Sequence, residues 1–273
     1  MDFSQLRRDS VFQKCLDQMV KVVAATREQE EPFSHFQVND LLPRDIYQEL
    51  VARKPAVELY GASSQYAAVS SETPRRTFSL TDKSLSRLCD ADRQLWLGVR
   101  DAFGSKQFRS AVFARLSKGL AYRFGIHESE TAGLRYYPLP DLYRETAGYS
   151  IAPHPDTRRK VVTMQFCLAA DDSQADLGTE FYRLSLNPLN LLREPRGFEI
   201  VKRPPFLPNS CNVFTVLNTV FVKSWHGRTT LRADSGTRDS LLNIWYANAE
   251  DGNPDILREH YADELQMSAA RAA

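Results

Sequence analysis

The sequence has few cysteines, and those it has are scattered. Its 273 residues contain 4 cysteines, and no two of them form a CxxC pair. A disulfide scaffold or a zinc knuckle needs closely spaced or paired cysteines, so neither is expected. Cys15 and Cys167 lie in apolar patterns that are typical of small core residues. A reducing cytoplasm is therefore the simplest location to expect.

Long apolar runs, repeats and a strong net charge are also missing. No window approaches the roughly 18 apolar residues that a membrane-spanning helix requires. The first 29 residues mix charges with apolar side chains, unlike a signal peptide. Lysine and arginine total 35 against 34 aspartate and glutamate. A nucleic-acid-binding protein usually carries a basic excess. We therefore expect a small-molecule substrate, with neither nucleic acid nor a membrane as partner; no oligomeric state is indicated.

The first part of the chain has helical periodicity instead. Ser10 and Gln13 resemble a capping box, and apolar residues recur at helical spacing between residues 12 and 23. Residues 35–38 alternate like a strand, and Pro43 suits the first turn of a second helix. Helical patterns also cover residues 90–102 and 107–120, whereas residues 56–75 look irregular.

From about residue 131 the pattern changes to short runs rich in β-branched and aromatic residues, separated by Gly, Pro, Asn and Asp. Eight such runs in close succession favour a sandwich or jelly roll over βαβ units. Asn253 and Pro254 then resemble the N-cap and first residue of a closing helix. The expected strands are residues 134–137, 149–154, 161–169, 179–184, 198–201, 212–217, 220–225 and 240–246.

These patterns predict one domain of the α+β class across residues 1–273. Residues 1–130 are expected to form a mainly helical support. Residues 131–248 are expected to form the β-core, and residues 249–273 the closing helix and tail.

The most informative segment lies at the end of one expected strand. His154 and Asp156 are two residues apart, and side chains at i and i+2 of an extended segment point to the same face. A second histidine, His226, follows the strand pattern at 220–225. Two histidines and one carboxylate form the facial triad of non-haem iron(II) oxygenases, which leaves coordination positions open. A chelating 2-oxo acid and O2 would need three such positions.

Further polar residues suit the 2-oxo acid. Arg238 begins the strand pattern that follows His226, and a guanidinium can bind the distal carboxylate of 2-oxoglutarate through two N–H groups. Ser240 lies at i+2 from Arg238, on the same face. Arg228 and Arg232 are rival anchors, but only Arg238 opens an apolar strand.

A phenol upstream completes this set. Tyr136 and Tyr137 both lie near the expected start of the β-core, where strand alternation lets only one of them point inward. We favour Tyr136 as a contact to the cosubstrate.

Taken in order, these motifs resemble the 2-oxoglutarate/Fe(II)-dependent dioxygenase superfamily, and in particular its prolyl-4-hydroxylase-like branch. The resemblance covers about residues 131–248, and residues 32–50 resemble the strand and helix that lead into that domain. Gly178-Thr179 matches the family's paired-glycine turn only in part, because Leu177 replaces the first glycine. The motifs are Leu134-Arg135-Tyr136, Pro153-His154-Pro155-Asp156, Leu177-Gly178-Thr179-Glu180-Phe181-Tyr182, Trp225-His226-Gly227 and Arg238-Asp239-Ser240-Leu241.

The resemblance implies a double-stranded β-helix with supporting N-terminal helices and a C-terminal helix. It implies Fe(II) as the cofactor, with 2-oxoglutarate and O2 as cosubstrates. His154, Asp156 and His226 would be the iron ligands, Arg238 the 2-oxoglutarate anchor, and Tyr136 and Ser240 assisting contacts. Halogenating relatives have a small residue where this chain has Asp156, so hydroxylation or another oxidation is expected.

Each histidine also has a simpler structural interpretation. His154 alone could belong to a surface turn, and His226 could be a core residue beside Trp225. The combination with Asp156 and Arg238 in the right order favours the metal interpretation. The other three histidines lack such partners. We interpret His35 and His127 as structural and His260 as part of a solvated helix face.

The expected activity is hydroxylation of an unactivated C–H bond in a small polar metabolite, with release of succinate and CO2. The alternatives are a hydroxylase of a protein or peptide side chain, such as proline, and a cupin-like binding protein without turnover. Substrate specificity is expected in the loops 138–148, 158–160 and 185–208. Candidates for polar substrate contacts are Asp141, Tyr143, Arg144 and Arg159; a solvated loop end explains Arg159 equally well.

Overall fold

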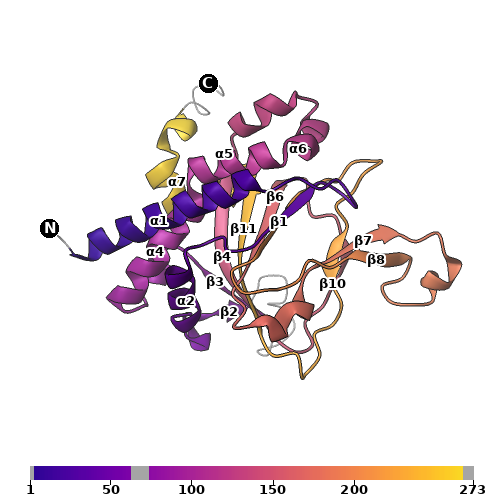
Figure 1. Cartoon of the computed structure of the whole chain (residues 1–273), viewed down its shortest axis with the longest axis horizontal. Coiled ribbons are helices and arrows are strands. Elements are labelled where there is room, and N and C mark those ends of the chain that lie inside the picture. Colours follow the sequence, from indigo (N-terminus) through magenta and orange to yellow (C-terminus); the bar gives the residue numbers. More distant parts are fainter. Residues whose placement is uncertain (1–2, 63–73, 267–273) are drawn as a thin grey trace.

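A computed structural model describes residues 3–62 and 74–266 of the chain, in which helices pack against two antiparallel β-sheets (Figure 1). The helices are α1 (Phe3–Ala25), α2 (Arg44–Ala52), α3 (Asp82–Leu85), α4 (Asp90–Gly104), α5 (Lys106–Arg115), α6 (Ser117–Phe124) and α7 (Pro254–His260). Short 3-10 helices are η1 (Val57–Leu59), η2 (Glu128–Gly133), η3 (Asp172–Leu177), η4 (Pro188–Leu191) and η5 (Ala249–Asp251). The strands are β1 (His35–Val38), β2 (Gly61–Ala62), β3 (Arg75–Ser79), β4 (Tyr137–Glu145), β5 (Ile151–His154), β6 (Lys160–Cys167), β7 (Glu180–Leu184), β8 (Phe198–Lys202), β9 (Cys211–Thr215), β10 (His226–Arg228) and β11 (Arg238–Tyr246).

The helical layer begins with α1, whose apolar residues face the rest of the protein. Val11, Cys15, Met19 and Val23 recur every four residues and are all buried. They share one core with α4, α5 and the outer face of the larger sheet. The predicted capping box at Ser10 is wrong, because α1 begins at Phe3 and Ser10 lies in its interior.

The helices predicted after Pro43 and at residues 90–102 are confirmed, and the helix predicted at residues 107–120 needs one correction. Pro43 is the N-cap of α2, and α4 covers the predicted residues 90–102. The single helix expected at 107–120 is divided into α5 and α6 at Leu116, whose φ of −97° and ψ of 30° leave the helical region. Leu116 is fully buried, so tertiary packing overrides the local periodicity.

The strands of the β-core alternate between the two sheets as the chain proceeds, except that β7 and β8 both belong to the smaller sheet. Within the described residues, β4, β6, β9 and β11 belong to a seven-stranded sheet, whereas β5, β7, β8 and β10 form a four-stranded one. The orders are β1-β9-β6-β11-β4-β3-β2 and β5-β10-β7-β8, and every pairing is antiparallel. The fold is a double-stranded β-helix of the α+β class.

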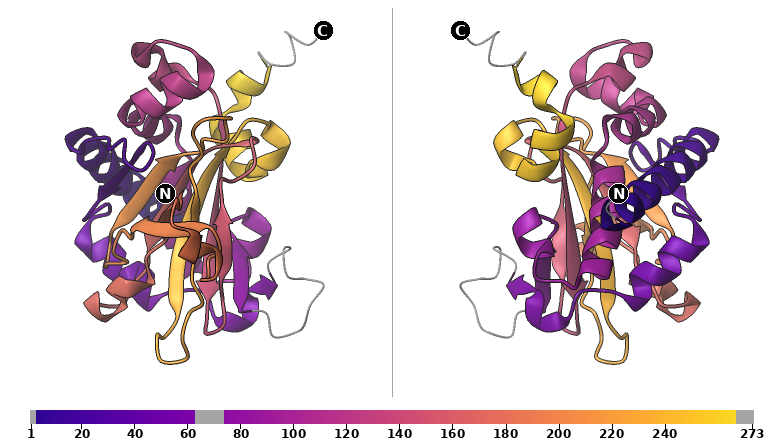
Figure 2. Two further views of the ribbon diagram at one scale, coloured as in Figure 1. Left: turned by 90° about the vertical axis from the view of Figure 1, so that its right-hand side faces the viewer. Right: turned by 90° about the vertical axis from the view of Figure 1, so that its left-hand side faces the viewer.

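The largest departure from the sequence prediction is β4. Residues 138–148 were expected to be a loop at the mouth of the site, and residues 134–137 a strand. Instead β4 spans Tyr137–Glu145 and pairs along its whole length with β11, beside which it runs through the middle of the molecule (Figure 2). Pro138 and Pro140 are tolerated because β3 pairs only with residues 141–145 of β4. The first half of β4 therefore has one edge without a strand neighbour, where a missing N–H costs little.

The strand expected at 220–225 is also wrong. Thr219 closes a turn there by bonding to Val222, and β10 begins only at His226. Val220 and Phe221 are 85% and 90% exposed, so their apolar character does not report a buried strand. The other expected strands are found within a few residues of their predicted bounds.

The closing helix forms as predicted. Asn253 caps α7 by accepting hydrogen bonds from the backbone N–H groups of Asp255 and Ile256. Of the region expected to be irregular, residues 63–73 lie outside the described residues. None of the helices in the described part of the chain is both long and apolar enough to cross a membrane.

Candidate metal centre

Two histidines meet across the smaller sheet. His154 is the last residue of β5 and His226 the first of β10, and the two are paired in the antiparallel register. Residues directly opposite each other on antiparallel strands present their side chains on the same face. The imidazole rings accordingly lie with their centroids 4.4 Å apart.

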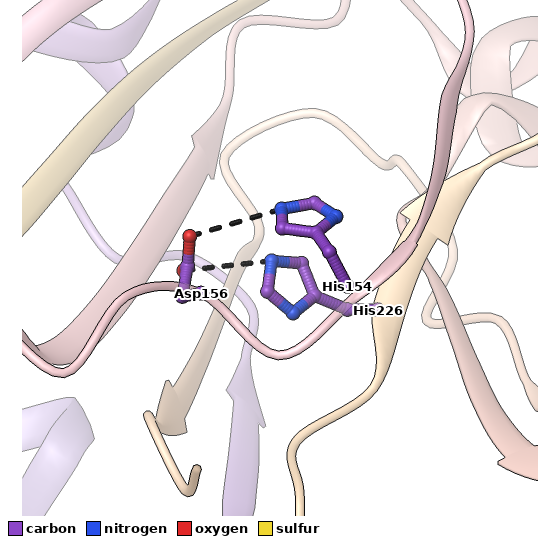
Figure 3. Close-up of side chains that lie close together, drawn as sticks. All are labelled: His154, Asp156 and His226. Carbon is purple, nitrogen blue, oxygen red and sulfur yellow. Dashed lines mark ion pairs between the residues drawn. The ribbon is translucent and has the colours of Figure 1, made fainter.

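Asp156 reaches these histidines through a turn. Its φ of 56° is left-handed, a conformation that aspartate adopts more readily than most residues. The predicted strand alternation therefore does not bring His154 and Asp156 together; the turn after β5 does. The Nε2 atoms of His154 and His226 lie 3.7 Å and 3.5 Å from the two carboxylate oxygens of Asp156 (Figure 3). One atom from each residue can thus ligate a single ion, since these atoms all lie within 4.8 Å of one another.

The backbone fixes which nitrogen of each ring can bind a metal. Nδ1 of His154 donates a hydrogen bond to the carbonyl oxygen of Ala152, at 2.9 Å. Nδ1 of His226 donates to the carbonyl of Ser224, at 2.8 Å. A carbonyl can only accept, so Nδ1 carries the proton in both rings and a neutral ring keeps its lone pair on Nε2, facing Asp156.

The surroundings hold His226 and Asp156 in a metal-binding protonation state. Burial lowers the pKa of His226 to about 4, although the charge of Asp156 opposes this. Burial alone would raise the pKa of Asp156, but His226 and Lys160 together lower it to about 2. Lys160 Nζ is 2.6 Å from one carboxylate oxygen, and the Thr163 hydroxyl donates to the other at 3.0 Å. At neutral pH, His226 is therefore neutral and Asp156 ionised, as metal ligands must be.

A second group of potential ligands in the described part of the chain is much less suitable. Asp101, Glu259 and His260 also lie close together, outside the cavity. Arg8 contacts both carboxylates at 2.5 Å, and Arg100 lies 2.8 Å from Asp101. A cation there would meet two guanidinium groups. The prediction that His260 lies on a solvated face is wrong, because its ring stacks on Phe12 and lies against Asp101.

The triad opens into a cavity between the two sheets that Arg238 also lines. Thr163 of β6 contacts Asp156, and Gln165, two residues further along the strand, contacts Arg238. Nη2 of Arg238 donates to Gln165 and Thr179 at 2.9 Å each, and Nε donates to the Leu177 carbonyl at 2.6 Å. Nη1 pairs with Glu145. The cavity lining combines these charged groups with apolar side chains: Arg75, Glu145, Tyr149, Ile151, His154, Asp156, Lys160, Thr163, Gln165, Thr179, Phe214, His226, Gly227, Arg228, Arg238, Leu242 and Ile244.

Neither assisting residue proposed from sequence belongs to this lining. Ser240 is buried on the face of β11 that also carries Arg238, and its hydroxyl lies 3.5 Å from the amide nitrogen of the lining residue Gln165. The expectation for Tyr136 is not supported by its position, because the ring packs between Phe113 and Phe124 on the helical side of the larger sheet. Tyr136 precedes β4 and is not subject to the strand alternation that we assumed. Tyr149 supplies the phenol that lines the cavity.

Of the rival anchors, Arg228 also lines the cavity and donates to the Gly178 carbonyl at 3.0 Å. Arg232 is exposed and pairs with Asp234.

None of the four substrate candidates belongs to the cavity lining. Asp141 is buried and accepts hydrogen bonds from Ser79 and Leu80. Arg144 lies on the face of β4 opposite to that of Asp141, and it binds Asp239 through two nitrogens, at 2.8 and 3.0 Å.

The other two candidates differ in how near they come to the cavity. Arg159 is exposed and pairs with Asp251. Tyr143 comes nearest, because Arg75, which lines the cavity, lies 4.4 Å over its ring. The assignments of Asp141, Tyr143 and Arg144 depended on an expected loop that proved to be β4, whereas Arg159 was assigned from the expected loop 158–160.

Several lining residues were missed, although some had a signal in the sequence. Thr163 and Gln165 are polar residues at alternate positions of an otherwise apolar strand, which marks an inward face with a polar partner. Glu145 could have been found in the same way had β4 been recognised. Arg75 lies on β3, far from the motifs, and carries no comparable signal.

No family model matches the sequence, and no curated protein matches it either. Among solved structures, the protein is similar to a Pseudomonas putida prolyl-4-hydroxylase, at 14% identity and a TM-score of 0.44 over 85% of this chain and 98% of that one. It is similar to a rice dioxygenase for auxin oxidation, at 13% identity and a TM-score of 0.46 over 94% and 91% of the two chains. It is also similar to EctD from S. alaskensis with 2-oxoglutarate and 5-hydroxyectoine, at 11% identity and a TM-score of 0.44 over 82% and 78%.

Because these identities and scores are low, we base the functional proposal on the side chains of this chain.

Proposed function

We propose that this protein is a 2-oxoglutarate- and O2-dependent non-haem iron(II) oxygenase that hydroxylates an unactivated C–H bond. The observation that carries the proposal is the convergence of His154, Asp156 and His226 on one point of a cavity that Arg238 also lines. A metal site and a carboxylate anchor in one cavity match the two binding groups of 2-oxoglutarate.

The donor set fits iron(II). Two imidazole nitrogens and one carboxylate suit a first-row transition metal better than the all-oxygen shells of Mg²⁺ or Ca²⁺. Three protein ligands leave positions open for small molecules. When bound, iron and 2-oxoglutarate would supply the activation of O2, with succinate and CO2 as products.

The protein's own residues bind and orient. Arg238 would bind the distal carboxylate of 2-oxoglutarate, supported by Gln165 and Thr179. Lys160 and Thr163 hold the Asp156 carboxylate in place. Apolar side chains on the sheet faces, such as Phe214 and Ile244, help to exclude water from the reacting bond.

For the substrate, we propose a small polar metabolite. Besides the metal ligands and the anchor Arg238, the cavity presents other buried charged groups, among them Arg75, Glu145 and Arg228. Such groups need polar or charged partners when water is displaced. The alternatives are a protein or peptide side chain as substrate and a binding protein without turnover.

The test is anaerobic titration of the purified protein with Fe(II) and then 2-oxoglutarate, following the visible charge-transfer band of the chelate. We expect a band in the wild type and none in His226→Ala. Arg238→Gln should need at least about tenfold more 2-oxoglutarate, because a charge-assisted contact is lost. His127→Ala is the matched control, since His127 is an exposed histidine outside the cavity.

Succinate formation with O2 then separates an enzyme from a binding protein, and a panel of metabolites and peptides separates the two substrate classes. Absence of the band in folded wild-type protein would refute the oxygenase proposal.

A further inference from the structure

Glu145 lies between two arginines at the anchor end of the cavity. One carboxylate oxygen contacts Nη1 of Arg238, and the other lies 3.1 Å from Nε of Arg75. The three residues form a row across the larger sheet, because Glu145 is the register partner of Arg75 on β3 and of Arg238 on β11. Their side chains are 2%, 11% and 3% exposed for Glu145, Arg75 and Arg238 respectively. A carboxylate is thus buried against the anchor proposed for 2-oxoglutarate.

Glu145 and an incoming carboxylate would compete for the same nitrogen of Arg238. Nε and Nη2 of Arg238 already donate to Leu177, Gln165 and Thr179. Nη1 is the remaining terminal nitrogen, and it pairs with Glu145. Two carboxylates at one guanidinium would also repel each other in a site that water does not screen.

Arg75 offers Glu145 an alternative partner. Its guanidinium lies 4.4 Å over the ring of Tyr143 and 5.4 Å from that of Tyr149, so two aromatic faces hold it beside Glu145. Two guanidinium groups and one carboxylate leave one positive charge at this end of the cavity. The distal carboxylate of 2-oxoglutarate would neutralise it. Arg228 adds to the positive charge nearby, because it shares the single carboxylate of Glu180, at 3.4 Å, with Arg203, at 2.5 Å.

We propose that Glu145 competes with the distal carboxylate of 2-oxoglutarate for Arg238, and that Arg75 relieves this competition by holding Glu145. The inference rests on the proposed function. Binding transfers Glu145 from Arg238 to Arg75, and the pair sets the affinity of the protein for its cosubstrate. Glu145 and Arg75 are positioning residues that act through Arg238.

The test is a double-variant cycle on 2-oxoglutarate binding to the anaerobic Fe(II) protein, measured by calorimetry and by the charge-transfer band. Glu145→Gln should bind about tenfold more tightly, because a neutral amide competes less well for a guanidinium. Arg75→Met should bind about tenfold more weakly, because Glu145 then has only Arg238. When Arg75→Met is added to Glu145→Gln, the affinity should change by less than about twofold relative to Glu145→Gln alone. No carboxylate is then left for Arg75 to hold.

Two controls separate competition from general damage. Glu264→Gln weakens a buried pair with Arg109, at 2.8 Å and outside the cavity, and should leave the affinity unchanged. Pyruvate lacks the distal carboxylate, so its affinity should not respond to Glu145→Gln. If Glu145→Gln does not fold, Glu145→Asp should shift the affinity in the same direction, because the shorter side chain withdraws from Arg238.

The outcomes distinguish this inference from the proposed function. Unchanged or weaker 2-oxoglutarate binding in folded Glu145→Gln or Glu145→Asp would overturn the competition, as would a full effect of Arg75→Met in the double variant. Absence of 2-oxoglutarate binding in every protein, the wild type included, would instead refute the proposed oxygenase.

Discussion

The position of the triad depends on single backbone sites as much as on its three ligands. Asp156 returns toward the histidines only because its backbone is left-handed. Gly227, directly after His226, lets β10 lie close to β5. A Cβ at Gly227 would come within 2.6 Å of the Ile151 carbonyl oxygen, closer than any real Cβ contact. A side chain there would push apart the two strands that carry the histidines.

Gly227→Ala should therefore weaken metal binding. We expect the affinity for Fe(II), or for Zn²⁺ as a probe, to fall by about tenfold, the scale of effects from residues that orient metal ligands. Gly133→Ala is the control, because a Cβ there meets no atom within 4 Å. Equal metal affinities of the two variants, measured by competition with a chelator, would show that strand spacing does not control the site.

At the scale of elements, tertiary contacts decide which local patterns persist. β4 contains two prolines and still forms. Within the described residues its first half is paired only with β11, so its other edge tolerates them, and its second half is paired on both sides. α7 is short, and isolated helices of this length are unstable. It is held by its N-cap and by the burial of Ile256 and Leu257.

Asn253 does more than cap α7. Its side-chain oxygen accepts two backbone N–H bonds, and its nitrogen donates to the Leu80 carbonyl, at 3.1 Å. Because Asn253 is fully buried, Asn253→Ala leaves these groups without partners. We expect a loss of about 2 kcal/mol in the free energy of unfolding, measured with urea.

Asn187→Ala is the comparison for this variant. Asn187 caps η4 by accepting from the Leu189 N–H, but at an exposed position. Its replacement should cost less than about 1 kcal/mol. A similar loss in both variants would contradict the role given to burial.

At the scale of the whole molecule, the two sheets are joined on the side of β1 by His35 and a group of aromatic rings. The His35 ring lies 5.1 Å from that of Phe181 on β7, and its Nε2 is 2.7 Å from Nζ of Lys202 on β8. Its Nδ1 donates to the Phe33 carbonyl, so Nε2 accepts from the lysine and the ring is neutral. Burial, together with the lysine charge, lowers the pKa of His35 from 6.5 to about 4.

This pKa predicts a loss of stability in mild acid. As the pH falls, the unfolded chain binds the proton near pH 6.5, before the folded protein does near pH 4. The contribution of His35 to the free energy of unfolding should thus decrease between these pH values, by at most about 1.4 kcal/mol per pH unit.

The free energy of unfolding of the wild type and His35→Gln, measured between pH 7 and 4.5, tests this. The wild type should lose more stability than the variant over that range, while the titration of other groups cancels in the difference. Parallel curves would contradict the prediction.

The sequence by itself determined the candidate metal ligands, the candidate carboxylate anchor and the class of fold. His154, Asp156, His226 and Arg238 could be named because metal and carboxylate binding depend on residue type and on order along the chain. The helices and most strands followed from local periodicity, which is a property of neighbouring residues.

Only the tertiary structure decided what surrounds these groups. Arg75, Glu145 and Arg238 come from three strands far apart in sequence, and they meet because of the register between those strands. Tyr136 was misplaced because its direction depends on where β4 begins, and β4 was missed because its prolines are acceptable only beside an unpaired edge. The lining of the cavity depends on pairing between distant segments, which local spacing does not encode.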